Sequence, residues 1–295
     1  MIDFVTVATV CSIFVILGAV ISGAGTTETL GKLGTITALP GAFSAAVSAA
    51  ITVYIMTRWG LPVSTSQAIV GAIVGWNVYS GSTTDLGTLT TIVSTWFLCP
   101  LLAGLLAAIL LPIISWILRK TKPHLLLLDQ GTRWALLLAG AFGAYSLGAN
   151  NIANVMGVFV PASPFGSVQL GPLLTLNSMQ MLFLLGGLAI AIGVFTYSRR
   201  VMMTVGNDLF QLSPAAAWVV VVSHSVVLFV FASTGLSSLL AGAGLPQIPL
   251  VPVSSSQAVV GAILGIGLLK GGAGIRWPVL GGIGIGWGVT PVCAG

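Results

Sequence analysis

Two short polar segments interrupt the apolar chain, and they are nearly identical to each other. Residues 62–75 read Pro-Val-Ser-Thr-Ser-Gln-Ala-Ile-Val-Gly-Ala-Ile-Val-Gly, and residues 252–265 repeat eleven of these fourteen positions. A proline followed by serine and threonine is typical of the start of a helix. The first turn of a helix presents unpaired N–H groups and a partial positive charge, which favour an anion. The two copies therefore predict two helix starts, at Pro62 and Pro252, that hold an anion without a lysine or arginine.

The hydroxyls and amides of these first turns are the candidate anion ligands. They are Ser64, Thr65, Ser66, Gln67, Ser254, Ser255, Ser256 and Gln257. A structural role is the alternative, because Ser and Thr in apolar helices often hydrogen-bond the carbonyl four residues earlier or a neighbouring helix. The duplication of the whole cluster favours binding.

A third polar segment, residues 148–157, carries three asparagines within five positions. Asn150 and Asn154 share one helix face, and Asn151 also neighbours Asn154. Three amides in apolar surroundings are costly unless they are paired. Asn150 and Asn151 could bind the anion through their NH₂ groups. Alternatively, carbonyl oxygens could hold a coupling Na⁺, for which the candidates are Asn151, Asn154, Gln67 and Gln257. A purely structural hydrogen-bond cluster is the third reading.

Few ionisable side chains approach these segments. Glu28 and Asp208 are candidates for ion coupling, and a solvated position at the end of a helix is the alternative for both. His224 lies within an apolar stretch between two serines, where a packed histidine and a proton relay are the two readings.

The elements that position these residues follow from composition. Of 295 residues, 56% are hydrophobic and 5% are charged, whereas soluble domains carry about 25% charged residues. A soluble enzyme, a disordered chain and a nucleic-acid-binding domain are excluded. Spanning helices need about 20 apolar residues, which predicts an all-α polytopic membrane protein with nine spans: 4–22, 41–58, 63–80, 88–117, 133–149, 172–197, 214–234, 254–269 and 278–295.

The basic residues orient these spans. If the loop at 118–132 is cytoplasmic, strict alternation puts nine of the ten lysines and arginines inside and only Lys32 outside. Cytoplasmic loops are enriched in Lys and Arg. The pattern predicts a multi-pass protein of the cell membrane with a cytoplasmic 118–132 loop.

Under this orientation the two copies of the motif enter the membrane from opposite sides. This predicts an inverted-repeat bundle with broken or re-entrant helices. The first repeat covers 1–117, the linker 118–132 and the second repeat 133–295. Segment 148–157 lacks a counterpart in the first repeat, since the repeat offset would place it before Met1. We therefore expect a missing first helix, and a truncated C-terminus because the chain stops within an apolar run.

These motifs resemble those of the PiT family of inorganic phosphate transporters, which includes sulfate permeases. The family pattern is a duplicated Gly-Ala-Asn-Asp-x-Ala-Asn segment and a Pro-Val-Ser-Thr-Thr/Ser-His/Gln segment. The first occurs here at 148–154, with Asn151 in place of the aspartate, and the second at 62–67 and 252–257. The resemblance implies symport of inorganic phosphate with Na⁺ or H⁺, no other cofactor, and a homodimer. It leaves the coupling ion open, because the family's aspartate is the natural cation ligand or proton carrier.

Three other functions remain as alternatives. Sulfate carries no proton, so a neutral pocket of amides and hydroxyls suits it, and a sulfate permease is the runner-up. An anion channel would show flux without ion coupling. A membrane serine hydrolase would need one activated serine with a base and an oxyanion hole, and a duplicated serine cluster argues against this.

Overall fold

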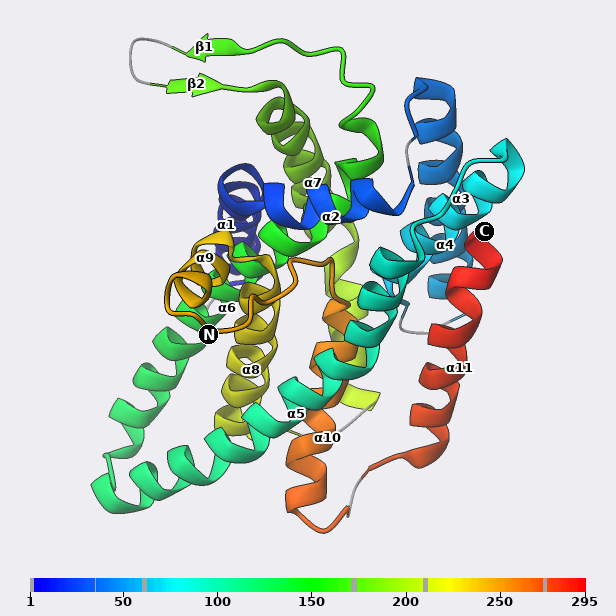
Figure 1. Cartoon of the computed structure of the whole chain (residues 1–295). Helices are drawn as coiled ribbons and strands as arrows, with labels where there is room; N and C mark the ends of the chain where they lie inside the picture. Colours follow the sequence, from blue (N-terminus) through cyan, green and yellow to red (C-terminus); the bar gives the residue numbers. More distant parts are fainter. Residues whose placement is uncertain (1–2, 35, 60–62, 171–173, 209–211, 273–274) are drawn as a thin grey trace.

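The computed structural model describes residues 3–34, 36–59, 63–170, 174–208, 212–272 and 275–295, and of residues 170, 174 and 197–208 it describes the backbone alone. The described chain is almost entirely helical, with one two-stranded hairpin (Figure 1). The elements are α1 (Phe4–Ser22), α2 (Ala24–Leu33), α3 (Leu39–Arg58), α4 (Thr65–Ser80), α5 (Leu86–Thr121), α6 (Leu125–Met156), the 3₁₀ turn η1 (Gly157–Phe159), β1 (Val168–Leu170), β2 (Leu174–Leu176), α7 (Ser178–Asp208), α8 (Pro214–Ala232), α9 (Thr234–Gly242), α10 (Ser255–Leu269) and α11 (Trp277–Ala294).

All nine predicted segments contain helix, and six helices of the described residues are long and apolar enough to cross a membrane. α4 and α10, with 16 and 15 residues, extend only about 24 and 22 Å. A hydrocarbon core is about 30 Å thick. The two helices that begin at the duplicated motif are therefore too short to span alone, as broken helices would be.

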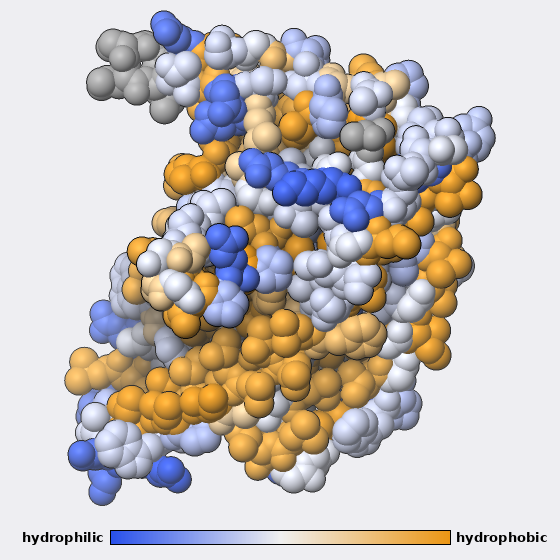
Figure 2. Space-filling model, viewed as in Figure 1, coloured by the Kyte–Doolittle hydropathy of each residue, from blue (hydrophilic) through white to orange (hydrophobic). Residues whose placement is uncertain are grey.

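The outer surface is apolar, which fits a polytopic membrane protein. Along α5, Phe97, Leu101, Leu105 and Ile109 are exposed at four-residue spacing, while the opposite face with Ala103 and Ala107 is fully buried. Figure 2 shows the resulting band of hydrophobic surface across the lower half of this face. Large side chains thus face the lipid and small ones face the neighbouring helices, as is usual for helices that pack in membranes.

The two copies of the motif share their packing as well as their sequence. α4 lies against α3 and α11, and α10 lies against α8 and α5. A Cβ on Gly71 would overlap the carbonyl oxygen of Pro291, and one on Gly261 would overlap that of Pro100. One turn later Gly75 and Gly265 are equally close to the backbone of the partner helix. In each case the two backbones are in contact because glycine has no side chain to separate them.

Several boundaries differ from the predictions. The predicted linker at 118–132 is mostly helical, because α5 continues to Thr121 and α6 begins at Leu125. α6 runs to Met156 and so carries the whole asparagine segment. The short helices α2 and α9 and the antiparallel pair β1–β2, which pairs Val168 with Leu176, were not predicted.

Candidate anion and cation site

The duplicated serines cap their helices. Ser64 Oγ accepts a hydrogen bond from the backbone N–H of Gln67 at 3.2 Å, and Ser254 Oγ accepts one from Gln257 at 3.3 Å. Pro252 does not begin a helix, because α10 starts at Ser255, three residues later. The prediction of a helix start at Pro252 was wrong in this detail, since the serine satisfies the first turn and fixes the boundary. Pro62 lies outside the described residues.

A chain of hydrogen bonds joins α6 to both copies of the motif. Asn154 Nδ2 donates to Ser66 Oγ at 2.8 Å, and Ser66 Oγ donates to the carbonyl of Val253 at 3.1 Å. Asn150 Nδ2 donates to the carbonyl of Val251 at 3.2 Å. The asparagine helix is thereby tied to α4 and to the extended segment before α10. These three side chains are buried.

Four buried side-chain amides have carbonyl oxygens without hydrogen-bond partners. Asn150 Oδ1, Asn154 Oδ1, Gln67 Oε1 and Gln257 Oε1 are buried and accept no hydrogen bond from the described residues. An unpaired buried acceptor costs about 1–3 kcal/mol. Four of them lie on the three segments that the sequence singled out, and carbonyl oxygens are ligands that a hard cation prefers.

The site is electrically neutral over the described residues. Asp3, Glu28, Asp85 and Asp129 are all exposed, and these residues form no cluster of His, Cys, Asp or Glu that could hold a metal ion. Amide and hydroxyl dipoles are therefore the groups available to an ion bound here.

The structure separates the remaining candidates. Asn151 is half-buried and its Oδ1 accepts from Asn154 at 3.1 Å, so it lies beside the site. Ser256 is half-buried and shares a 3.0 Å hydrogen bond with Ser254, and Ser255 is also half-buried. Thr65 is exposed on α4.

Of the two carboxylates predicted for ion coupling, the structure describes only that of Glu28. Glu28 is exposed on α2, although Thr26 and Thr27 beside it are buried. The side chain of Asp208 lies outside the described residues. The exposed position of Glu28 agrees with the solvated alternative, because α2 turns its threonines inward and its glutamate outward.

Two residues at the site were missed from the sequence. Thr26 Oγ1 donates to the carbonyl of Ala149 at 3.2 Å, directly before Asn150. Cys99 is fully buried, and its thiol contacts the carbonyl of Ser254 at 3.6 Å. The three threonines around Glu28 were a sequence signal that could have indicated Thr26. A single cysteine in an apolar run gave no such signal for Cys99.

His224 and its neighbour Ser223 are polar groups of α8 outside this network. His224 Nε2 and Ser223 Oγ are buried and find no hydrogen-bond partner among the described residues. Among the described residues, this histidine nitrogen therefore forms no hydrogen bond with a serine that could act as a nucleophile.

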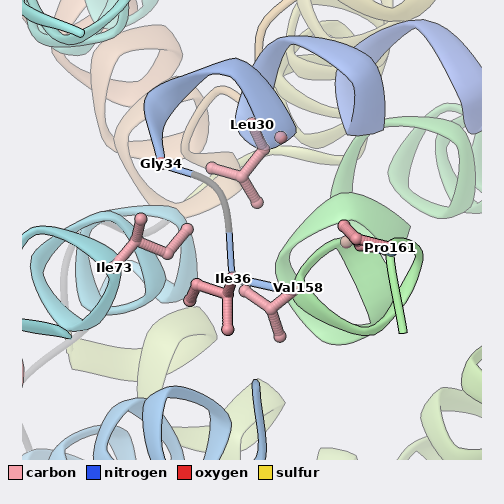
Figure 3. A pocket seen from close by; sticks show the side chains of 8 residues that line it. Leu30, Gly34, Ile36, Ile73, Val158 and Pro161 are labelled. Carbon is pink, nitrogen blue, oxygen red and sulfur yellow. The ribbon is translucent and has the colours of Figure 1, made fainter. Parts of the chain in front are cut away.

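An apolar layer lies between the site and one end of the bundle. Figure 3 shows Leu30 of α2, Ile73 of α4, Ile36 and Val158 converging on a pocket of only about 10 Å³. Val158 follows Asn154 by one turn, and Ile73 follows Gln67 by less than two. This volume holds at most one water molecule.

Comparison with known proteins identifies relatives of this arrangement. The chain is 27% identical to a candidate phosphate permease of Methanocaldococcus jannaschii, over 86% of this chain and 72% of that one. It is 25% identical to sodium-dependent phosphate transporter 1-A of Xenopus laevis, over 60% of this chain and 23% of the relative.

A solved structure described as the sodium-dependent phosphate transporter has the same fold. The TM-score is 0.76 at 24% identity, and the alignment covers 99% of this chain and 88% of that one. The model of the phosphate transporter family matches residues 1–295. This multi-pass membrane protein belongs to the phosphate transporter family.

Proposed function

We propose that the protein is a Na⁺-coupled symporter of inorganic phosphate in the cell membrane. The observation that carries this proposal is the set of four buried, unpartnered carbonyl oxygens on Asn150, Asn154, Gln67 and Gln257. Na⁺ is a hard cation that prefers oxygen ligands. The relatives named as sodium-dependent support Na⁺ over H⁺.

Phosphate is held by the two capped helix starts. The first turns of α4 and α10 carry N–H dipoles that favour an anion. Ser256 and Ser255, which are only half-buried, and the Asn151 amide supply further donors. Ser64 and Ser254 act as caps that hold these turns in place, and Ser66 and Asn154 hold α6 against them.

Coupling follows from the neutrality of the site. A lone anion or cation that enters a low-dielectric site loses its hydration free energy, and the dipoles of the site compensate for only part of this loss. Two opposite charges a few ångströms apart attract strongly in such surroundings. Each ion therefore raises the affinity for the other, and the carrier moves both together.

The alternating-access movement is that of an inverted repeat. The equivalent packing of Gly71 on Pro291 and of Gly261 on Pro100 supports two pseudo-equivalent halves. We infer that the 118–132 segment is cytoplasmic, that Lys32 is external, and that the apolar layer around Ile73 opens when the halves rock.

Uptake by proteoliposomes tests the proposal. Radiolabelled phosphate should accumulate with an inward Na⁺ gradient, and an equal K⁺ gradient is the control. A proton gradient in Na⁺-free buffer separates H⁺ coupling from Na⁺ coupling. Phosphate uptake that does not depend on the Na⁺ or the proton gradient would indicate a channel and contradict symport.

Sulfate is a second candidate substrate because every described carboxylate lies away from the site. Monohydrogen phosphate carries a proton that a carboxylate would accept, whereas sulfate needs donors only. Labelled sulfate in the same vesicles decides between them. We expect excess unlabelled sulfate to compete only weakly with phosphate.

A further inference from the structure

A second pocket lies at the end of the bundle where α5 turns into α6. It has a volume of about 290 Å³ and is lined mainly by apolar side chains, among them Ile114, Leu118, Leu127, Leu128 and Trp218. The indole N–H of Trp218 donates to the carbonyl of Ala135 at 3.1 Å, so its polar group is already paired. Along α6, Ala135 is about 22 Å from Asn150, so this pocket is separate from the ion site.

Basic residues are adjacent in sequence to several residues that line this pocket. Between Leu118 and Trp134 the chain carries four basic residues, Arg119, Lys120, Lys122 and Arg133, and one acidic residue, Asp129. Asp129 is paired with Arg133 at 2.6 Å. Arg119 and Lys122 are exposed and form no ion pair with the described residues.

The position of Lys122 connects the charge to the pocket. It follows Leu118 by four residues and precedes Pro123, and both of these line the pocket. Lys120 lies over the ring of Trp116 at 4.9 Å on another face of α5. Figure 2 shows hydrophilic residues gathered at the lower left, where Figure 1 places the α5–α6 turn, directly beneath hydrophobic surface.

We propose that this pocket binds an anionic phospholipid, with one acyl chain against the apolar lining and the headgroup phosphate beside Lys122 and Arg119. Bilayer tails are as apolar as the pocket, so burial alone would select no lipid. Charge provides the selection, because a lysine or arginine near the headgroups contributes about 1 kcal/mol toward anionic lipid. The unbalanced basic charge at the mouth thus favours phosphatidylglycerol over phosphatidylcholine.

Lipid retention by the full chain tests this proposal. The protein is released from nanodiscs containing equal amounts of phosphatidylglycerol and phosphatidylcholine, and bound lipid is counted by native mass spectrometry. We expect one retained phosphatidylglycerol per chain. Arg119→Gln with Lys122→Gln should lower its retention at least fivefold, since each charge is worth about fivefold in affinity. Arg58→Gln with Arg276→Gln removes the same charge elsewhere and should leave retention unchanged.

Filling the pocket gives a test that does not depend on charge. Gly131 lines the pocket, and a Cβ built there meets no described atom within 4 Å, as is also true of Gly140 further along α6. Gly131→Leu should abolish retention of phosphatidylglycerol, whereas Gly140→Leu should preserve it.

Three outcomes would overturn the proposal. The first is equal retention of the two lipids by the wild type. The second is equal loss of lipid in the charge variant and its control. The third is a dimer that Gly131→Leu dissociates, which would make this face an interface between two copies. Displacement of the lipid by inorganic phosphate alone would likewise show that the site binds a free anion.

Discussion

At the scale of single residues, the side chains that look alike in the sequence have different tasks. Ser64 and Ser254 accept backbone N–H groups as helix caps, while Ser66 joins Asn154 to the carbonyl of Val253. Asn150 and Asn154 donate through their side-chain nitrogens, while their carbonyl oxygens are unpaired. We therefore assign a structural task to Ser64, Ser66, Ser254 and these two amide nitrogens, and propose cation binding for the unpaired carbonyl oxygens.

Removing one of these oxygens should weaken the coupling ion. Gln67→Met keeps the length of the side chain and deletes its amide group, whose Oε1 has no hydrogen-bond partner among the described residues. We expect the Na⁺ concentration for half-maximal phosphate uptake to rise about 10- to 100-fold, since one bond to a charged group is worth roughly 1.5–3 kcal/mol. Stability to unfolding should not fall.

Gln130→Met is the matched control because Gln130 is exposed on α6. It should leave the Na⁺ dependence unchanged. An unaltered Na⁺ dependence in Gln67→Met would remove that oxygen from the proposed ligands.

Removing a cap should affect stability and transport differently at different helices. Ser254→Ala should lower the free energy of unfolding by about 1 kcal/mol and also reduce phosphate uptake, because α10 begins at the site. Ser233 caps α9 by the same geometry, through a 3.1 Å bond from the N–H of Leu236. Ser233→Ala should cost a similar stability, measured by thermal unfolding in detergent, with uptake retained. Equal loss of uptake in both variants would mean that the loss reflects reduced stability and not a role of Ser254 at the site.

At the scale of elements, the short helices α4 and α10 depend on close backbone contact. Glycines at corresponding positions, Gly71 and Gly261, touch the carbonyls of Pro291 and Pro100 in α11 and α5. α11 thus supports α4, which carries the first copy of the motif, and α5 supports α10, which carries the second copy. These contacts hold the two helices whose first turns belong to the proposed ion site.

Alanine at these glycines should separate the helices. Gly71→Ala or Gly261→Ala should lower stability by about 1–3 kcal/mol, because overpacking forces the backbones apart, and should reduce uptake. Gly140→Ala is the control, since its Cβ meets open space, and it should raise stability slightly through helix propensity. Thermal unfolding of the three proteins gives the comparison. Unchanged stability in Gly71→Ala would show that α11 shifts freely away from α4.

At the scale of the whole molecule, the distribution of ten basic residues on an apolar bundle carries the proposed orientation in the membrane. The chain around the α5–α6 turn carries half of the basic side chains that the structure describes, and an apolar pocket lies at the same end. In the proposed orientation, the positive-inside tendency and the selection of anionic lipid would act on the same end of the protein.

Labelling of single cysteines tests the proposed orientation. In a background with Cys11, Cys99 and Cys293 replaced by alanine, an impermeant thiol reagent added to whole cells should label Lys32→Cys. It should label Lys122→Cys only after the membrane is opened. The reverse pattern would invert the topology and contradict a cytoplasmic 118–132 segment.

The sequence by itself determined the features that depend on neighbouring residues. Apolar length fixed the helices, and serine before a helix start fixed the caps, because a cap bond joins residues three apart. The linker at 118–132 was predicted as a loop, but helix propensity continues on both sides of Pro123 and leaves only residues 122–124 outside helices.

Only the tertiary structure decided which candidates meet. Asn154 and Ser66 are 88 residues apart, and Ser66 and Val253 are 187 apart, so their contact depends on the packing of three separate segments. Hydrophobic periodicity does not show which face of α2 is buried. It therefore could not predict that Thr26 donates to the carbonyl of Ala149 while Glu28 is exposed. The residue types of a candidate ion site were readable in the chain, whereas the unpaired oxygens of Asn150 and Asn154 exist only because packing buries these amides and pairs their nitrogens.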